Sequence, residues 1–409
     1  MRAQAQKMMV QLPASEPVED KIQRHAKVLP QQLQAIRDKM YAPTSQKTLR
    51  HFMTHEVTKL TGISEGMLRN LSIEGKGPTP ERRANNYRVY TLDQVNELRR
   101  LVAKIKPHDA LRVLPHRRPG EAIQILGVIN FKGGSAKTTT TAHLAHYLAL
   151  QGYRVLAIDL DPQASLSVMF GVQPETEVGP NETIYAAVRY TDTPRPMREV
   201  IRKTYFPGVD LVPGNIELQE FETETPHALA KTNGSNKEAL FVERLRLAIA
   251  QVEDDYDIVV LDTAPTLGFM TLAAVYAVTG LIVSVHPGML DVLSMSQFLL
   301  MLDGLVGTIR DFGGTLSAEF FQYVITRHDP NDQAQAQVVS LLRHLFAEDV
   351  LTPTAVDSTA IELAGLAKKT VYELEVGEVS RETGKRARDS MDAVNGRILD
   401  LVWRAWGRA

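Results

Sequence analysis

A run of small residues between two lysines is found at Lys132-Gly133-Gly134-Ser135-Ala136-Lys137-Thr138. A phosphate-binding loop needs small residues, so that consecutive backbone N–H groups can close around the anion, and a helix N-terminus beneath them. It also needs a lysine for the phosphate charge and a hydroxyl for Mg²⁺. The segment supplies all of these. We therefore predict a nucleotide site whose loop comprises Lys132, Gly133, Gly134, Ser135, Ala136, Lys137, Thr138 and Thr139.

Within this loop, Lys137 is expected to neutralise the β and γ phosphates, and Thr138 to bind Mg²⁺. The usual pattern G-x-x-x-x-G-K-[ST] fails at both glycine positions, which are Phe131 and Ala136 here. The match is instead to K-G-G-x-x-K-T, which adds Lys132 at the mouth of the loop. The alternative for Lys132 is an ordinary surface lysine.

Carboxylates follow two further apolar runs. Asp159 and Asp161 follow residues 154–158, and Asp262 follows Ile258–Leu261. Carboxylates at the carboxyl ends of adjacent parallel strands face the ligand crevice of an open α/β sheet. We therefore predict that Asp262 and Asp159 hold Mg²⁺ through water, beside Thr138.

These motifs resemble those of the deviant Walker A ATPases, the family that includes the ParA and MinD proteins. The resemblance implies weak ATP hydrolysis, with Lys132 reaching across a nucleotide-sandwich dimer to the partner's phosphates and Asp161 positioning the attacking water. Lys132, Lys137 and Asp161 are then the catalytic set. The same resemblance places the nucleotide base near His286-Pro287 and Thr326-Arg327. Ala136 stands where most members have glycine, and this departure bears on nucleotide affinity and turnover.

The elements that position these residues are expected from residue 121 onward. Apolar runs at 123–129, 154–159, 209–212, 258–261, 280–285 and 320–326 alternate with helical segments. This alternation predicts an α/β fold with a doubly wound, mostly parallel sheet. The last helix carries an apolar stripe at Met391, Val394, Ile398, Leu401 and Ala405, which favours packing on this domain over a membrane-surface helix.

Residues 51–105 carry a different pattern. Gly62 supplies a tight turn between two short helices, Ser64 is placed to cap the second, and Val57, Leu60, Ile63 and Leu68 can form a small core. The segment resembles the winged helix-turn-helix of MerR-like regulators, whose wing strand is matched by Tyr87 to Thr91. The alternative is a helical hairpin that only packs. The candidate DNA contacts are Arg69, Lys76, Arg82, Arg83 and Arg88.

Charge divides the chain at about the same place. Residues 1–120 contain 22 Lys and Arg against 11 Asp and Glu, whereas residues 121–409 contain 24 against 37. A basic segment beside an acidic one suggests that the first touches nucleic acid. A second basic group could bind DNA without regard to sequence, or be a solvated face: Lys368, Lys369, Arg381, Lys385, Arg386 and Arg388.

We predict a helical segment over 1–50, a DNA-binding domain over 51–105, a linker over 106–120 and the ATPase domain over 121–409. In the first segment, residues 21–40 carry one helical stripe that could serve dimerisation, and Pro30 is expected to divide it into two helices. Cysteine is absent, which excludes disulfides and thiolate metal sites. The first thirty residues are charged and lack an apolar segment, so we expect no signal peptide. No run of eighteen apolar residues is found, so we expect no membrane span.

From about residue 20 the chain resembles the large ParA partition ATPases, in particular the RepA type of repABC plasmid systems. The resemblance implies a cytoplasmic, nucleoid-associated ATPase with ATP/ADP and Mg²⁺ as cofactors. It implies ATP-dependent homodimers on non-specific DNA, stimulation by a ParB-like centromere-binding protein, no stable membrane association, and repression of its own operon through residues 51–105. Two alternatives are a nucleotide-switched transcriptional regulator and a MinD-like membrane positioning ATPase.

Overall fold

The computed structural model describes residues 17–40, 47–83, 87–130, 132–190, 193–231, 241–311 and 314–408. The chain divides into two units, residues 1–47 and 48–409, which we describe separately. In the first unit, α2 (Val18–Met40) is one continuous helix, so the expected break at Pro30 is wrong. A proline inside a helix leaves the carbonyl four residues earlier without its donor. That residue, Ala26, is exposed, so water can replace the lost bond.

A seven-stranded sheet forms the centre of the second unit, in the order β10-β9-β4-β8-β5-β7-β6. All neighbouring strands are parallel except β6 and β7, which are antiparallel. The six predicted strands are found within one residue of their expected bounds, which confirms the doubly wound α/β fold. The strands are β4 (Gln124–Ile129), β5 (Val155–Asp159), β6 (Arg202–Lys203), β7 (Val209–Val212), β8 (Ile258–Asp262), β9 (Gly280–Val285) and β10 (Phe320–Ile325).

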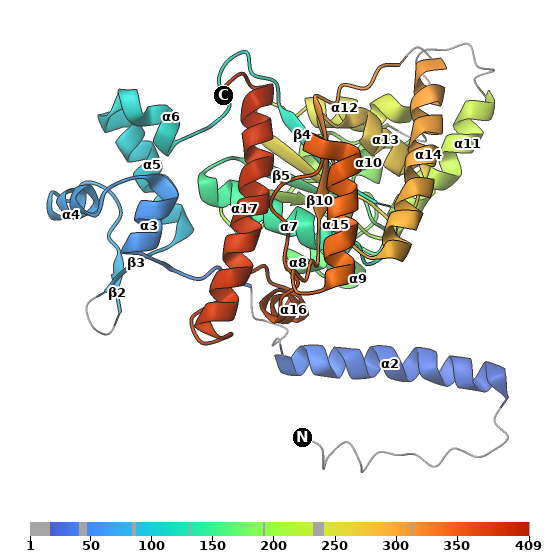
Figure 1. Cartoon of the computed structure of the whole chain (residues 1–409), viewed down its shortest axis with the longest axis horizontal. Helices are drawn as coiled ribbons and strands as arrows, with labels where there is room; N and C mark the ends of the chain where they lie inside the picture. The colour runs from blue at the N-terminus through green and yellow to red at the C-terminus, as the bar shows by residue number, and fades with distance from the viewer. Residues whose placement is uncertain are drawn as a thin grey trace. The chain divides into compact units, whose positions relative to one another are not determined.

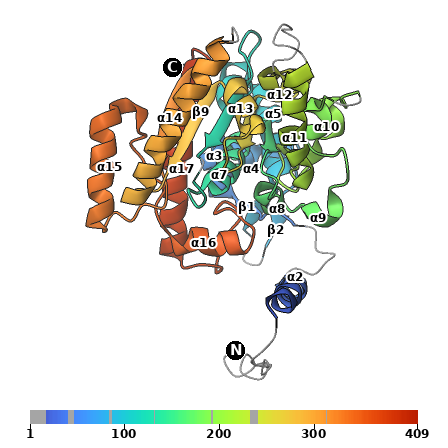
Figure 2. The same ribbon diagram turned by 90° about the vertical axis from the view of Figure 1, so that its right-hand side faces the viewer.

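Helices cover both faces of this sheet (Figures 1 and 2). Successive strand residues alternate between two apolar clusters, because side chains alternate along a strand. The first cluster includes α7 (Lys137–Gln151), α8 (Ser165–Met169), α16 (Thr359–Leu366) and α17 (Arg381–Ala405). The second includes α10 (Tyr185–Val188), α11 (Gln219–Lys231), α12 (Phe241–Ala250), α13 (Phe269–Ala277), α14 (Met289–Asp311) and α15 (Gln333–Phe346). Four short helices lie in the connecting segments: α9 (Pro174–Glu177), η4 (Met197–Glu199), η5 (Ile216–Leu218) and η7 (Ala347–Asp349).

The C-terminal helix α17 packs on the sheet domain, as predicted from its apolar stripe. Met391, Val394 and Ile398 are buried in the first cluster. The stripe therefore faces the protein.

Residues 48–105, which we call the head, form a small three-stranded sheet with order β1-β3-β2 and three helices. Gly62 adopts a φ of 67° in the turn between the first two helices, and Ser64 Oγ accepts a hydrogen bond from the Met67 N–H at 3.3 Å. Both features agree with the sequence prediction. The elements are β1 (Phe52–Met53), α3 (Thr54–Thr61), α4 (Glu65–Ile73), β2 (Glu81–Arg82), β3 (Arg88–Tyr90) and α5 (Leu92–Ile105).

The apolar core of the head is continuous with the sheet domain. Val57, Ile63 and Leu68 of the head belong to the same buried cluster as Leu144 and Leu148 of α7. The head is thus packed on the core and not suspended from it.

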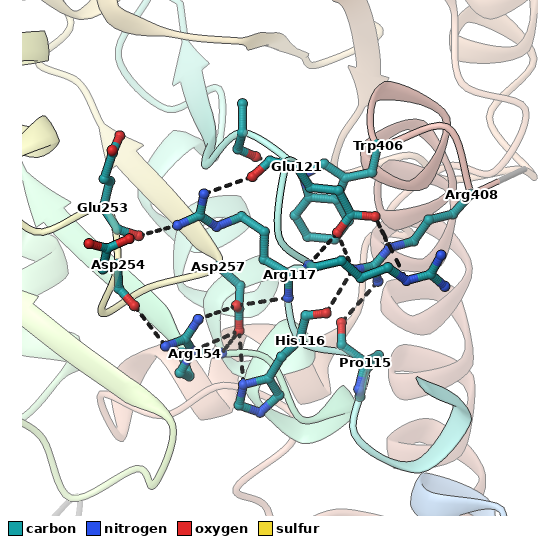
Figure 3. A network of polar contacts seen from close by, with 12 residues as sticks. Pro115, His116, Arg117, Glu121, Arg154, Glu253, Asp254, Asp257, Trp406 and Arg408 are labelled. Atoms are coloured by element: carbon teal, nitrogen blue, oxygen red, sulfur yellow. Dashed lines mark hydrogen bonds and ion pairs between the residues drawn. The ribbon is translucent and has the colours of Figure 1, made fainter. Parts of the chain in front are cut away.

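The connector, residues 106–120, contains η3 (Pro107–Asp109) and α6 (Ala110–Val113) and is fastened to the core by charged side chains (Figure 3). Arg408 binds both oxygens of Glu121, at 2.8 and 2.6 Å, and donates to the Pro115 carbonyl at 3.0 Å. The buried Asp257 accepts from the Arg117 N–H at 3.0 Å and from Arg154 Nη2 at 2.7 Å. The connector is therefore tied to Arg408 near the C-terminus and to Asp257 just before β8. Its role as a domain boundary stays a prediction.

Helix α14 presents an apolar stripe to solvent. Leu290, Leu293 and Leu300 are 73%, 59% and 72% exposed. Among the described residues, Met289–Gly307 is the one segment long and apolar enough to cross a membrane, by length and composition alone. The expectation that no segment qualifies is therefore corrected. Polar residues such as Asp291 and Gln297 interrupt the apolar run, so a search for uninterrupted apolar residues misses it.

Candidate nucleotide site

The predicted phosphate loop lies between the end of β4 and the start of α7. Its turn passes through Gly134 at a φ of 81° and Ala136 at 64°, and α7 begins at Lys137. A Cβ atom added to Gly133 or Gly134 would meet no atom within 4 Å, so the space beside both residues is open. Lys137 Nζ bonds to the Lys132 carbonyl at 3.3 Å. Phe131 lies outside the described residues.

Side chains from three strand ends hold this loop in place. Asn130 donates to the Ser284 carbonyl at 2.7 Å and accepts from the Lys132 N–H at 3.0 Å. The hydroxyls of Ser284 and Ser135 are 3.1 Å apart, and Thr326 donates to the Ser135 carbonyl at 3.1 Å. Asn130 and Ser284 were not predicted as site residues. Asn130 could have been predicted from the sequence, because it lies between a predicted strand and the phosphate loop.

Asp159 and Asp262 are paired neighbours at the carboxyl ends of β5 and β8 and are fully buried. Asp159 accepts hydrogen bonds from the Asp161 N–H and from the N–H and hydroxyl of Ser167, at 3.2, 2.8 and 2.7 Å. Asp262 Oδ1 accepts a hydrogen bond from the Thr141 hydroxyl at 3.4 Å, the nearby Thr138 side chain lowers the pKa of Asp262, and its Oδ2 has no partner among the described residues. The two acids differ accordingly: Asp159 organises the loop, and Asp262 keeps a free oxygen.

Burial raises the pKa of both carboxyls, because each loses the water that would stabilise its charge. The proximity of the two groups raises the pKa of Asp262 further. Lys137 is also buried, which lowers its pKa, while Asp262 and Asp161 partly offset this effect. A site that holds two buried acids and one buried lysine is stabilised by a ligand that brings both an anion and a cation.

Asp161 lies on the loop that follows β5, with its side chain nine-tenths buried. Its Oδ1 accepts from the Gln163 N–H at 2.9 Å, which fixes the carboxylate. Gly214, after β7, packs closely on this loop, since a side chain there would lie 2.9 Å from the Asp161 carbonyl oxygen. Gly214 is a further position that sequence reasoning missed, because it lies on a different strand end.

Lys132 forms an ion pair with Asp291, the third residue of α14, at 2.7 Å. The second lysine therefore joins the phosphate loop to the helix that carries the exposed leucines. Asp291 was not predicted, and no local motif marks it.

Comparison with known proteins gives the family of this chain. A family model described as "AAA domain" matches residues 123–311. The "Putative replication protein A" of Sinorhizobium fredii is 44% identical over 390 residues, covering 95% of each chain, and Protein SopA of Escherichia coli K12 is 28% identical, covering 89% and 92%. A solved structure titled "Partition Protein" has this fold, with 20% identity, a TM-score of 0.63 and coverage of 91% and 97%. The chain belongs to the ParA-like partition ATPases.

The ligands of ParA-like ATPases are ATP or ADP with Mg²⁺. The described site fits such a ligand: Gly133 and Gly134 line an open space, and Asp262 Oδ2 is a buried oxygen without a partner. Asp159 and Asp262 are neighbours at paired strand ends, and the Thr138 side chain is near enough to lower the pKa of Asp262, so these three residues would be the ones to hold a cation. Their roles toward a nucleotide stay predictions.

The candidate DNA contacts of this ParA-like chain gather on the head. Arg69 is exposed on α4, and Arg82 and Arg83 are exposed on and after β2. Lys76 pairs with Glu74 at 2.9 Å, and Arg88 on β3 is half-buried beside Tyr90. The structure therefore brings four of the five to exposed positions on α4, the loop after it and β2. Their contact with DNA stays a prediction.

The second basic group is partly occupied by internal ion pairs. Lys369 binds Glu378 at 2.7 Å, and Lys385 binds Asp389. Arg388 lies 3.6 Å from Glu56 of the head. Arg388 thus has a role in holding the head, which weakens its assignment to a DNA-binding surface.

We expect Ala136→Gly to raise the free energy of unfolding by about 1 kcal/mol. Ala136 is held at a φ of 64°, a conformation that costs an L-residue energy and costs glycine none. Urea unfolding without nucleotide measures the change. The matched control is Ala393→Gly in the exposed middle of α17, where the same substitution should lower stability by about 1 kcal/mol. A loss of stability at position 136 would contradict the strain assigned to this loop.

Proposed function

We propose that this chain is a plasmid-partition ATPase that binds Mg-ATP, hydrolyses it slowly and forms ATP-dependent homodimers on non-specific DNA. The observation that carries the proposal is one site that combines an open phosphate loop, two buried acids at adjacent strand ends and a second lysine at the loop's mouth. A general nucleotide binder needs the loop alone. In this proposal the added acid, Asp161, serves hydrolysis, and the added lysine, Lys132, serves contact with a second subunit.

In this proposal Lys137 and the N-terminus of α7 hold the β and γ phosphates, with backbone N–H groups of residues 133–138 around them. Thr138 and Asp262 hold Mg²⁺, directly or through water, and Asp159 supports that site through the loop it organises. Bound Mg²⁺ supplies charge neutralisation at the phosphates. Asp161, fixed by its bond with the Gln163 N–H, orients the attacking water.

Dimerisation is proposed through the face that carries Lys132. The Lys132–Asp291 ion pair sets the exposed stripe of α14 beside the phosphate loop. Exposed apolar stripes of this kind mark interaction surfaces. A second copy placed there would cover the leucines and bring its own Lys132 to the bound phosphates. Helix α2, whose Ile22 and Leu29 are exposed, is a further candidate dimer contact.

The head is proposed to bind the operator of its own operon, with α4 in the major groove and the β2–β3 wing beside it. Arg69, Lys76, Arg82, Arg83 and Arg88 are the proposed contacts. A ParB-like centromere-binding protein is the proposed partner that accelerates hydrolysis. The resulting cycle places the protein on the nucleoid in the cytoplasm.

The test is binding to a random-sequence DNA duplex, followed by fluorescence anisotropy with ATP, with ADP and without nucleotide, across a salt series. We expect binding that requires ATP and weakens steeply with salt, because phosphate contacts release counterions. ATP-independent binding or no binding would overturn the partition proposal.

Two rivals are separated when operator binding, ATP hydrolysis and liposome flotation are measured beside this test. A nucleotide-switched regulator would bind only its operator and would not hydrolyse ATP. A membrane positioning ATPase would float with anionic liposomes in the presence of ATP, and the apolar α14 makes this arm necessary.

A further inference from the structure

An arginine is buried where the head, the connector and the sheet domain meet. Arg99, on α5 of the head, is only 1% exposed. Its Nη1 donates to the Val113 carbonyl at 2.9 Å, and its Nη2 donates to the carbonyls of Leu60 and Leu150 at 2.8 and 2.7 Å. These three acceptors belong to the last turns of three helices, α3, α6 and α7.

The arrangement explains how a charge can be buried there. Burial lowers the pKa of Arg99 to about 10, so the side chain is still a cation at neutral pH. The carbonyl ends of helices carry partial negative charge and lack partners within their own helix. Three such ends around one guanidinium compensate its charge and satisfy the free carbonyls together.

One of the three helices begins at the phosphate loop. Helix α7 runs from Lys137 to Gln151, about 22 Å, and the Leu150 carbonyl stands at its far end. Gly152 caps this helix at a φ of 99°, and a side chain there would lie 3.0 Å from Arg99 Nη1 and 3.1 Å from its Cζ. The end of the phosphate-loop helix is therefore fitted against Arg99.

The head also packs on α7 through the shared apolar cluster, and Arg50 Nε donates to the Tyr372 carbonyl at 2.9 Å. Among the described residues, the ion pairs between the head and the core reach α17. Glu56 binds Arg50 and lies near Arg388, and Lys59 pairs with Asp392 at 3.5 Å. These contacts hold α3 on the C-terminal helix. By contrast, the Arg99 side chain bonds both to α3, next to the Gly62 turn, and to α7, the helix that begins at the phosphate loop.

The interface between the head, the connector and α7 is not closely packed on every side of Arg99. A pocket of about 730 Å³, open to solvent, lies beside Arg99 and is lined by Leu60 of the head, Arg112 of the connector, and Tyr147 and Gln151 of α7. Close-packed interfaces resist small shifts, whereas a pocket on one side allows α3 to move relative to α7.

We infer that Arg99 couples occupation of the phosphate loop to the conformation of the head. Nucleotide binding at the start of α7 alters the position of its last carbonyls, and Arg99 transmits that change to the end of α3 and the turn before α4. The inference rests on the proposed nucleotide and DNA sites. It assigns them a physical connection, so that the nucleotide sets the DNA affinity of the head.

The test is hydrogen exchange of the full-length protein with and without saturating Mg-ADP, read at the phosphate loop and at residues 57–73. In the wild type, Mg-ADP should slow exchange in residues 132–140 and change exchange in residues 57–73 by about 5-fold or more, the usual lower range of a coupling free energy. In Arg99→Met, the loop response should persist and the head response should disappear. Arg99→Lys keeps the charge but loses the forked geometry, and it should retain a reduced head response.

The matched control is Arg112→Met. Arg112 Nη1 donates to the Gly62 carbonyl at 3.0 Å, at the same turn, but none of its described hydrogen bonds reaches α7. Its head response should equal that of the wild type.

A head response that persists in Arg99→Met, or that is absent from the wild type while the loop responds, overturns the inference. If Arg99→Met does not fold, Arg99→Lys decides, and an undiminished head response in that variant counts against the coupling. Failure of Mg-ADP to protect the loop in the wild type would instead reject the proposed nucleotide site.

Discussion

Replacement of Asp161 by alanine should slow ATP hydrolysis by about 100-fold or more while leaving ATP binding intact. The carboxylate acts electrostatically on Asp262, one of the proposed metal-site acids, and is fixed by the Gln163 N–H. Its loss should remove the group proposed to orient water without opening the phosphate loop. The ATP-bound dimer should consequently accumulate on DNA. Phosphate release, together with the rate of dissociation from a random duplex after an ADP chase, measures both effects.

Asp161→Asn separates the charge of this residue from its structural role. The asparagine oxygen can still accept from the Gln163 N–H, so the loop should keep its shape. Slow hydrolysis by both variants would support a role of the charge in the reaction. Rapid hydrolysis by Asp161→Ala would reject the catalytic assignment of this residue.

Lys137→Ala should weaken Mg-ATP binding by about 100-fold or more, the scale expected when a buried charge loses its partner. Lys137 is buried at the start of α7 and is the cation nearest the expected phosphates. Titration with a fluorescent ATP analogue measures the affinity. The thermal shift that Mg-ATP gives the wild type should also be lost.

Lys132→Ala is the matched control for this experiment. Lys132 is partly exposed and pairs with Asp291 at the loop's mouth, so its loss should spare nucleotide binding and remove ATP-dependent dimers, seen by light scattering. Unaltered ATP affinity in Lys137→Ala would contradict the assignment of Lys137 to nucleotide binding. Lost ATP affinity in Lys132→Ala would contradict the assignment of Lys132 to dimerisation alone.

Much of the fold follows from the sequence because its signals are local. The buried strands are mostly apolar runs of four to seven residues, and the phosphate loop, the Gly62 turn and the Ser64 cap each depend on neighbours in the chain. Asp159 and Asp262 could be placed together because the strands that they end are parallel and the fold was expected to be doubly wound. These positions needed no knowledge of tertiary contacts.

The features that sequence reasoning missed depend on distant contacts. Asp291 meets Lys132 across 159 positions, and Gly214 is required by the backbone of a different strand end. The exposed stripe of α14 could not be told from a core stripe, since both are apolar. At Pro30 the expected break failed because an exposed helix can exchange one internal bond for water.

The contacts that anchor the connector have a consequence for exchanging parts between related proteins. A head joined by a flexible tether can be transplanted at the tether. Here Arg99 and the contacts of Arg117 and Arg408 cross the seam, so a chimera cut in residues 106–120 would leave a buried guanidinium and a buried carboxylate facing foreign backbone. We therefore expect heads of this type to diverge together with the far end of the phosphate-loop helix. If the head binds an operator as proposed, a new specificity is more readily reached by changes on α4 than by recombination.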